Sequence, residues 1–239
     1  MASIEEPAKE RAAREAAGLV QSGMTVGLGS GTTAAILVRR LGERMREEGL
    51  RFVGVPTSVA TAELARGLGI PLRELDEVDA LDINLDGADE VDPQFRMIKG
   101  RGGALLREKI VACVARRRVT VITQDKRVSR LGQKAPLPVE VSSIGLQHTE
   151  RRLRAMGAVT RIRMGPPGVP FRTDGGNAII DCTFAGRHEP EELDGLLRSV
   201  VGVFETGLFL GLCDLLVVGT DDGVEQVPST SPRNRGCGG

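Results

Sequence analysis

Residues 25–33 read TVGLGSGTT, a short apolar run that passes through a glycine-rich turn into a helical pattern over residues 32–46. A strand, a tight turn and a helix in this order open a βαβ unit, which is typical of a parallel sheet. Glycines let backbone N–H groups approach an anion, and the start of the helix adds about half a positive charge. Ser30, Thr32 and Thr33 add hydroxyl groups beside those amides. The stretch therefore predicts either a phosphate cradle or a tight turn in which Thr32 only caps the helix.

The first half of the chain repeats this alternation. Alternating strand and helix patterns predict the α/β class with a parallel sheet. Strands are expected over residues 25–28, 51–55, 80–85, 97–98 and 119–123, and helices over residues 5–21, 32–46, 59–68 and 104–117.

The pattern changes after about residue 131, where Pro136 and Pro138 mark a joint. The expected order is then strand 139–141, helix 146–156, strand 158–164, turn 165–170, strand 178–184 and helix 190–200. This β-α-β-β-α order predicts a small α+β unit. Residues 214–219 and 224–227 are again strand-like, and their return to the first sheet would make the middle unit an insertion. Residues 229–239, rich in Ser, Pro, Arg and Gly, are expected to form a flexible tail.

The composition argues against several classes of partner. The 239 residues carry 32 Lys and Arg against 32 Asp and Glu, so there is no basic surplus for nucleic acid. Six Phe, no Trp and no Tyr make a poor platform for stacking bases. No apolar stretch approaches the length of a membrane span, and the charged N-terminus lacks the apolar core of a signal peptide. We therefore expect a cytoplasmic protein with no nucleic-acid or membrane partner.

The cysteines and histidines do not have the spacing of a metal site. Four cysteines include no C-x-x-C pair, and there are only two histidines. Structural zinc needs paired Cys and His spacings, so we expect no zinc.

The glycine-rich turn fits neither common nucleotide motif. A Walker A loop ends in Gly-Lys-Ser/Thr, and no lysine stands here. A dinucleotide site needs a third glycine, where Thr32 stands, and an acidic residue after the second strand, where Pro56 begins the sequence PTS. A small phosphorylated metabolite is the remaining ligand class.

Carboxylates gather at the end of the next predicted strand, where residues 86–90 read DGADE. Two close carboxylates can separate their pKa values and divide acid and base roles. They can also bind a divalent cation or cap the following turn. The sequence leaves these three interpretations open.

A cation and further exposed amides follow in residues 99–103, KGRGG, just before the helix that contains Arg107, Glu108 and Lys109. The helical neighbours of Glu108 are apolar, so burial would raise its pKa toward the range of a general base. Arg107 and Lys109 also have mostly apolar neighbours, so the pattern shows only that one of the three faces something special. A buried ion pair of Glu108 is the alternative interpretation.

The three loops together supply a phosphate cradle, clustered acids, a lysine and a candidate base. In open α/β sheets, ligands bind outside the carboxyl ends of the strands, where all three loops are expected. This set favours proton abstraction beside the carbonyl of a sugar phosphate, with cations holding the enediolate.

At these motifs the sequence resembles the ribose-5-phosphate isomerase A family. Residues 27–34 are similar to its phosphate loop, residues 86–90 to its acidic loop and residues 99–109 to its third block. Further blocks at residues 131–132, 136–141, 173–177 and 219–224 follow in the family's order, so the resemblance covers nearly the whole chain to about residue 227.

The resemblance implies a fold, a reaction and an assembly. The fold is a Rossmann-like parallel-sheet domain at residues 1–132 and 207–228, with an inserted ferredoxin-like α+β domain at residues 133–206. The reaction is the reversible conversion of D-ribose 5-phosphate to D-ribulose 5-phosphate in the pentose phosphate pathway, without metal or cofactor. The assembly is a homodimer or homotetramer.

The resemblance also assigns roles to residues. Glu108 is the base that moves a proton between C2 and C1, Asp86 and Asp89 handle ring opening and hydroxyl protons, and Lys99 stabilises the oxyanion. The implied substrate contacts are Ser30, Gly31, Thr32, Thr33, Asp86, Gly87, Ala88, Asp89, Lys99, Gly100, Arg101, Gly102 and Lys126.

Two of the three loops depart from the family pattern. Arg101 stands where the family often has glycine, which makes the contacts of residues 100–102 less specific, and the first loop reads SGTT rather than TGST. Two other hypotheses fit a related fold. One is a sugar-phosphate-sensing module of a regulator, although no basic stripe for DNA is visible. The other is a relative of the CoA-transferases, in which Glu108 would be a nucleophile.

Overall fold

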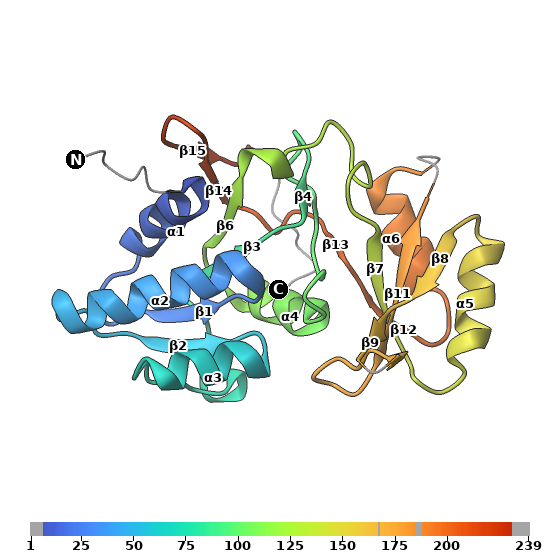
Figure 1. The fold of residues 1–239 in the computed structure, drawn as a ribbon, viewed down its shortest axis with the longest axis horizontal. Coiled ribbons are helices and arrows are strands. Elements are labelled where there is room, and N and C mark those ends of the chain that lie inside the picture. Colours follow the sequence, from blue (N-terminus) through green and yellow to red (C-terminus); the bar gives the residue numbers. More distant parts are fainter. Residues whose placement is uncertain (1–6, 167, 185–187, 231–239) are drawn as a thin grey trace.

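The larger part of the molecule is a six-stranded sheet with the strand order β15-β14-β6-β3-β1-β2 (Figure 1). The computed structural model describes residues 7–166, 168–184 and 188–230. The strands of the sheet are β1 (Thr25–Leu28), β2 (Val53–Pro56), β3 (Ile83–Gly87), β6 (Arg118–Thr123), β14 (Leu215–Gly219) and β15 (Val224–Pro228). The first five run parallel and β15 is antiparallel to β14. The predicted α/β class with a parallel sheet is confirmed.

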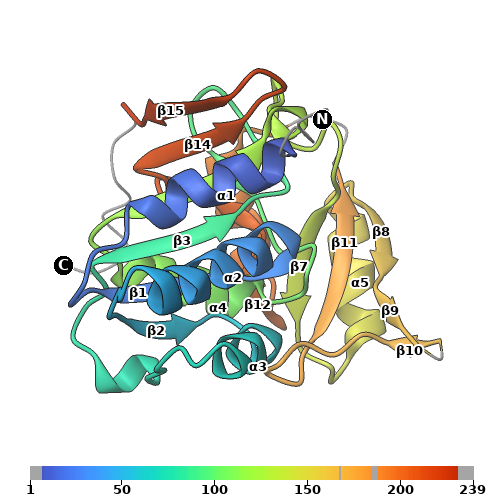
Figure 2. The same ribbon diagram turned by 60° about the vertical axis from the view of Figure 1, so that its left-hand side comes forward.

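Helices cover both faces of this sheet, with α1, α2 and α3 on one face and α4 on the other (Figure 2). Their bounds are α1 (Ala8–Gly18), α2 (Gly31–Glu47), α3 (Val59–Gly67) and α4 (Leu105–Val114). Side chains alternate along each strand, so Val217 joins the core under α1 and α2, whereas Leu216 and Val218 join the core beside α4. Burial on both faces explains the continuous apolar run of β14, which reads LLVVG.

In the sheet, β1 lies between β2 and β3, and the strand order reverses at this point. From β1 the chain passes through α2 to β2 on one side, whereas β3 pairs with the opposite edge of β1. Such a switch in strand order opens a crevice at the carboxyl ends of the two strands, which is where α/β proteins bind ligands. The predicted first and second loops follow β1 and β3.

A four-stranded antiparallel sheet forms the core of a second unit, on the right in Figure 1. Its elements are β7 (Leu137–Val141), α5 (Leu146–Ala155), β8 (Val159–Ile162), β11 (Ala178–Thr183), α6 (Pro190–Arg198) and β12 (Val203–Thr206). The sheet order β12-β7-β11-β8 and this β-α-β-β-α-β sequence are those of a ferredoxin-like unit. The last strand, β12, was missing from the sequence prediction. The proposed domain limits at residues 132, 133, 206 and 207 stay a prediction.

A small antiparallel sheet lies between the two larger ones. It consists of β4 (Glu90–Val91), β5 (Met97–Ile98) and β13 (Leu208–Phe209), in the order β13-β5-β4. The strand at residues 97–98 was therefore predicted at the right place but wrongly assigned to the parallel series. A hairpin of β9 (Met164–Gly165) and β10 (Val169–Pro170) replaces the predicted turn at residues 165–170, and two 3-10 turns, Leu75–Glu77 and Gln124–Lys126, complete the elements.

Several predicted bounds are wrong for identifiable reasons. The helix predicted over residues 104–117 ends at Val114, because Arg116 N donates to Leu81 O and the chain is already extended at Ala115. The strand predicted over residues 80–85 runs from Ile83 to Gly87, so Asp86 lies in the strand and not in the loop after it.

The two ends of the chain are only partly described. The predicted helix at residues 5–21 is observed as α1, and residues 5 and 6 lie outside the described part. Most of the predicted tail, residues 231–239, also lies outside it, whereas Ser229 N donates to Asp214 O. The predicted return of residues 214–219 and 224–227 to the first sheet is confirmed. Within the described ranges, each helix is too short or too polar to cross a lipid bilayer.

Candidate active site

A cavity of about 460 Å³ opens at the carboxyl ends of β1 and β3, where the three predicted loops meet. Every predicted substrate-contacting residue except Asp86 lines it, together with Glu108. The lining consists of Lys9, Ser30, Gly31, Thr32, Thr33, Gly87, Ala88, Asp89, Lys99, Gly100, Arg101, Gly102, Glu108 and Lys126. Asp86 lies one layer deeper, where it contacts Lys99.

The first loop brings the start of α2 against the end of β3. A Cβ atom on Gly29 would lie 2.1 Å from Asp86 Oδ1 and 2.7 Å from Asp86 Cα, so this close approach requires glycine. The N-cap is Ser30, whose hydroxyl is hydrogen-bonded to Thr57 Oγ1 at 2.5 Å and does not cap the helix. The interpretation of Thr32 as the cap is therefore wrong, because Thr32 is already inside α2. The first turn of α2 lines the cavity without a side-chain cap.

Three buried charged groups form the floor of the site. Lys99 Nζ lies 2.9 Å from Asp86 Oδ2 and 3.3 Å from Glu108 Oε2, and it donates to Gly87 O at 2.6 Å. Asp86, Lys99 and Glu108 are 4%, 6% and 3% exposed. One ammonium is thus shared by two carboxylates in a place that water hardly reaches. The alternative interpretation of Glu108, a buried ion pair, is correct as geometry and compatible with a role as base.

The two predicted acids of the second loop are held by backbone amides. Asp86 Oδ1 accepts hydrogen bonds from Ser30 N at 3.1 Å and Gly87 N at 2.7 Å. Asp89 Oδ2 accepts one from Arg101 N at 3.0 Å, which ties the second loop to the third. The Arg101 side chain itself is exposed. The carboxylates are therefore oriented before any ligand arrives.

The charge balance sets the protonation states of the floor. Burial raises the pKa of Glu108 to about 7; Asp86 and Asp89 act in the same direction, and Lys99 opposes them. Burial disfavours the ammonium of Lys99, but Asp86 and Glu108 outweigh it and raise the pKa of Lys99. Near neutral pH Glu108 can therefore take up and release a proton beside a permanent cation. This combination suits proton abstraction next to a carbonyl.

The sequence Arg107-Glu108-Lys109 was expected to place one residue in a special environment, and it places two. Glu108 faces the cavity, whereas Lys109 Nζ donates to Glu205 Oε1 at 2.7 Å, Thr206 O at 2.9 Å and Leu208 O at 2.7 Å. Arg107 is half-exposed and lies 3.6 Å from Asp174.

Lys9 is the lining residue that the sequence reasoning missed. It extends from the first turn of α1, and its Nζ donates to Thr32 Oγ1 at 3.3 Å. Nothing in the spacing of residues 8–18 marks it, because its place depends on the packing of α1 against α2. Lys126, from the turn after β6, supplies a further cation to the cavity and is about one-third exposed.

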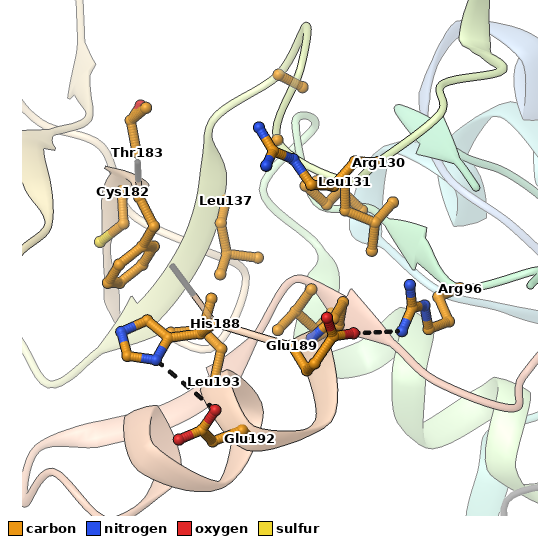
Figure 3. A pocket seen from close by; sticks show the side chains of 16 residues that line it. Arg96, Arg130, Leu131, Leu137, Cys182, Thr183, His188, Glu189, Glu192 and Leu193 are labelled. Atoms are coloured by element: carbon orange, nitrogen blue, oxygen red, sulfur yellow. Dashed lines mark hydrogen bonds and ion pairs between the residues drawn. The ribbon is translucent and has the colours of Figure 1, made fainter. Parts of the chain in front are cut away.

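A second cavity, of about 310 Å³, lies near the start of α6 and contains none of the predicted site residues (Figure 3). Its floor is apolar and includes Leu131, Leu137 and Leu193. Arg96 Nη1 lies 3.4 Å from Glu189 and 3.2 Å from Glu191, and its Nε is 2.6 Å from Asp92, so this cation is already surrounded by carboxylates. The carboxylates that line this cavity, Glu189 and Glu192, are largely exposed, whereas Glu108 in the first cavity is buried.

The described residues do not contain a metal-ligand cluster. Among them, no group of three or more His, Cys, Asp or Glu side chains is arranged to hold a metal ion. The position between Asp86 and Glu108 is taken by the Lys99 ammonium.

Comparison with known proteins gives consistent matches. The family model for ribose 5-phosphate isomerase A (phosphoriboisomerase A) matches residues 53–223. The chain is 50% identical to ribose-5-phosphate isomerase A of Thermomicrobium roseum over 92% of both chains, and 49% identical to that of a Roseiflexus species over 94% of this chain and 97% of the relative.

Solved structures agree with these matches. Ribose 5-phosphate isomerase A of Methanocaldococcus jannaschii superposes with a TM-score of 0.88 at 41% identity, covering 92% of this chain and 98% of that one. A D-ribose-5-phosphate isomerase in complex with phospho-erythronic acid superposes with a TM-score of 0.89 at 38% identity, covering 92% and 97%.

Proposed function

The chain belongs to the ribose 5-phosphate isomerase A family, and we propose that it interconverts D-ribose 5-phosphate and D-ribulose 5-phosphate in the pentose phosphate pathway. The observation that carries this proposal is the cluster of Glu108, Lys99 and Asp86 at the floor of a cavity whose rim is the uncapped start of α2.

The phosphate group fits the rim of the cavity. The first turn of α2 offers backbone amides and the positive end of the helix dipole to a dianion. Lys9 and Lys126 place two cations at the same cavity, and Thr32 and Thr33 add hydroxyl groups. With the phosphate there, the carbon chain of the sugar extends toward Lys99 and Glu108.

The proton transfer is assigned to Glu108. Its carboxylate takes the proton from C2 of the open-chain aldose, and the electron pair moves into a C1–C2 double bond as the carbonyl oxygen becomes an oxyanion. Lys99 stabilises that oxyanion, because its ammonium is fixed and poorly solvated. Glu108 then returns the proton to C1, and transfer of the hydroxyl proton from O2 to O1 completes the ketose.

The two aspartates divide the remaining work by position. Asp89 lines the cavity, so we assign to it ring opening and the exchange of hydroxyl protons. Asp86 lies behind Lys99 and holds the ammonium in place. Gly87, Ala88 and residues 100–102 supply the walls.

No metal is needed in this proposal, because the Lys99 ammonium supplies the positive charge next to both carboxylates. Turnover should therefore persist after dialysis against EDTA. Loss of activity that added magnesium or zinc restores would contradict this part of the proposal.

We also propose a cytoplasmic homodimer or homotetramer. Most exposed large hydrophobic side chains of the described residues belong to the ferredoxin-like unit, among them Ile144, Val201 and Phe204. Large exposed apolar side chains gathered in one unit favour a contact between subunits. Light scattering after gel filtration tests this, and a monomer at micromolar concentration would contradict it.

The test of the reaction is formation of ketose from ribose 5-phosphate by the purified protein. Robust production of ribulose 5-phosphate is expected, and its absence would reject the proposal. Binding without turnover would favour a sensing module, and transfer that depends on coenzyme A would favour a transferase with Glu108 as nucleophile.

A further inference from the structure

Phe209 lies beside the ammonium groups of both buried lysines. Its ring centroid is 5.2 Å from Lys99 Nζ and 4.8 Å from Lys109 Nζ, and the residue is 1% exposed. An aromatic ring attracts a cation within about 6 Å, most strongly where water is excluded. No conspicuous pattern in the sequence around residue 209 marks this contact.

The strand that carries Phe209 is locked to the strand before Lys99. In the pairing of β13 with β5, Phe209 is opposite Met97 and Leu208 is opposite Ile98. Lys99 N donates to Gly207 O at 2.9 Å, and a Cβ atom on Gly207 would lie 2.4 Å from Lys99 O. The backbone of Lys99 therefore cannot shift without β13.

The two lysines differ in how much they depend on the ring. The Lys109 ammonium has three close oxygen acceptors, which fix it without the ring. The Lys99 ammonium has one carbonyl acceptor, Gly87 O, and its other partners are the carboxylates of Asp86 and Glu108, at 2.9 and 3.3 Å. The ring provides an apolar, electron-rich wall beside it.

We infer that Phe209 is a positioning residue of the isomerisation, which acts by fixing the Lys99 ammonium where the oxyanion forms. The inference rests on the proposed function. Phe209 does not line the cavity, so its effect on the reaction passes through Lys99.

The test is a double-mutant cycle of Phe209→Leu and Lys99→Met with isomerisation as the readout. Phe209→Leu alone should lower kcat about 3- to 30-fold, the range of a desolvated cation–π contact, with KM within about twofold. In the Lys99→Met background the same change should alter kcat less than about twofold, because the group it positions is gone.

Phe52→Leu is the matched control. Phe52 is also buried, at 4% exposed, but it belongs to the core beneath α1 and α2. It should lower the urea midpoint and leave kcat unchanged. If Phe209→Leu does not fold, Phe209→Met replaces it, since the unbranched methionine side chain adapts to irregular gaps in a core and has no ring.

An equal loss of kcat in both backgrounds would mean that Phe209 only packs, and would overturn the inference, as would wild-type kcat in Phe209→Leu. The same four proteins give a second cycle in urea unfolding, where Phe209 and Lys99 should be coupled about 2- to 30-fold in the unfolding equilibrium constant. Additive effects of the two substitutions on the free energy of unfolding would also overturn the inference. If the wild type does not isomerise ribose 5-phosphate, the proposed function fails, and the unfolding cycle still decides the contact.

Discussion

Two lysines ten positions apart, Lys99 and Lys109, are buried to nearly the same extent and approach the same aromatic ring, yet their surroundings differ. The Lys109 ammonium is enclosed by the Glu205 carboxylate and two carbonyl groups. Burial lowers the pKa of Lys109, and the attraction of Glu205 offsets only part of that effect. Lys99 is shared by two carboxylates and opens into a cavity. Burial and charge alone therefore do not identify a reactive group. We propose that the reactive lysine is marked by an unequal number of carboxylates around it and by a cavity through which a ligand can reach it.

The largest expected effect is on the reactive cluster. Glu108→Gln keeps the size of the side chain and removes its ability to take a proton, so kcat should fall about 10²- to 10⁴-fold. Steady-state kinetics at pH 8 measures this, and circular dichroism confirms the fold. Near-wild-type turnover would mean that another group is the base.

The sealed cluster should respond in stability instead. Lys109→Met leaves the buried Glu205 carboxylate with less compensation, which should lower the free energy of unfolding by about 3–5 kcal/mol. Glu205 keeps its ion pair with Arg198, so we expect a loss of unfolding free energy near the lower end of this range. Urea unfolding measures the loss, and kcat of the folded enzyme should fall far less than in Glu108→Gln. An unchanged urea midpoint would show that the contact between Lys109 and Glu205 does not stabilise the fold.

Of the two lysine clusters, only the reactive one should contribute to the pH dependence of the reaction. Glu108 must be deprotonated to act, and its pKa is raised to about 7, so kcat/KM should rise with pH and level off above that value. Two units below the pKa the loss is about 100-fold. The second pKa of a phosphate group is about 6, so the titration of the substrate phosphate can be separated from that of Glu108 in the pH profile. A rise of kcat/KM centred near pH 4.5 would show that burial does not raise the pKa of Glu108.

The smallest effect is expected at the rim, where water screens the charges. Lys9→Ala should raise KM about 3- to 10-fold and leave kcat nearly unchanged, because the contact with phosphate persists throughout the reaction. Arg14 is a cation on the same helix outside the cavity lining, and Arg14→Ala is the control. Equal KM values for Lys9→Ala and Arg14→Ala would show that Lys9 does not contribute to substrate binding.

Much of the site could be predicted because short-range patterns encode it. The glycine-rich turn determines β1 and the start of α2 to within a residue, and the carboxyl ends of the parallel strands β1 and β3 bring the first two loops to one edge. The third loop joins them from β5, which lies in the small antiparallel sheet. The sequence indicated the apolar surroundings of Glu108 but not its partner, since Lys99 is placed by β5 and not by α4.

The missed features depend on long-range packing. Lys9 reaches the cavity only because α1 packs on α2, and Phe209 meets Lys99 only because β13 pairs with β5. The strand β12 is four residues long and partly exposed, so it lacks an apolar run. Asp86 was placed in a loop because the last two residues of β3, Asp86 and Gly87, resemble a turn in sequence.

The pairing of β13 with β5 also has a consequence for biosynthesis. Lys99 emerges from the ribosome long before Gly207 and Phe209, and β6 must wait equally long for β14. Contacts so distant in sequence form late and slowly, because the loop must close before they contribute. A nascent chain released before residue 209 would contain every group assigned to the chemistry, yet it would lack the strand that holds its lysine in place. Catalytic competence should therefore arise only after residue 209 has been synthesised and β13 has paired with β5.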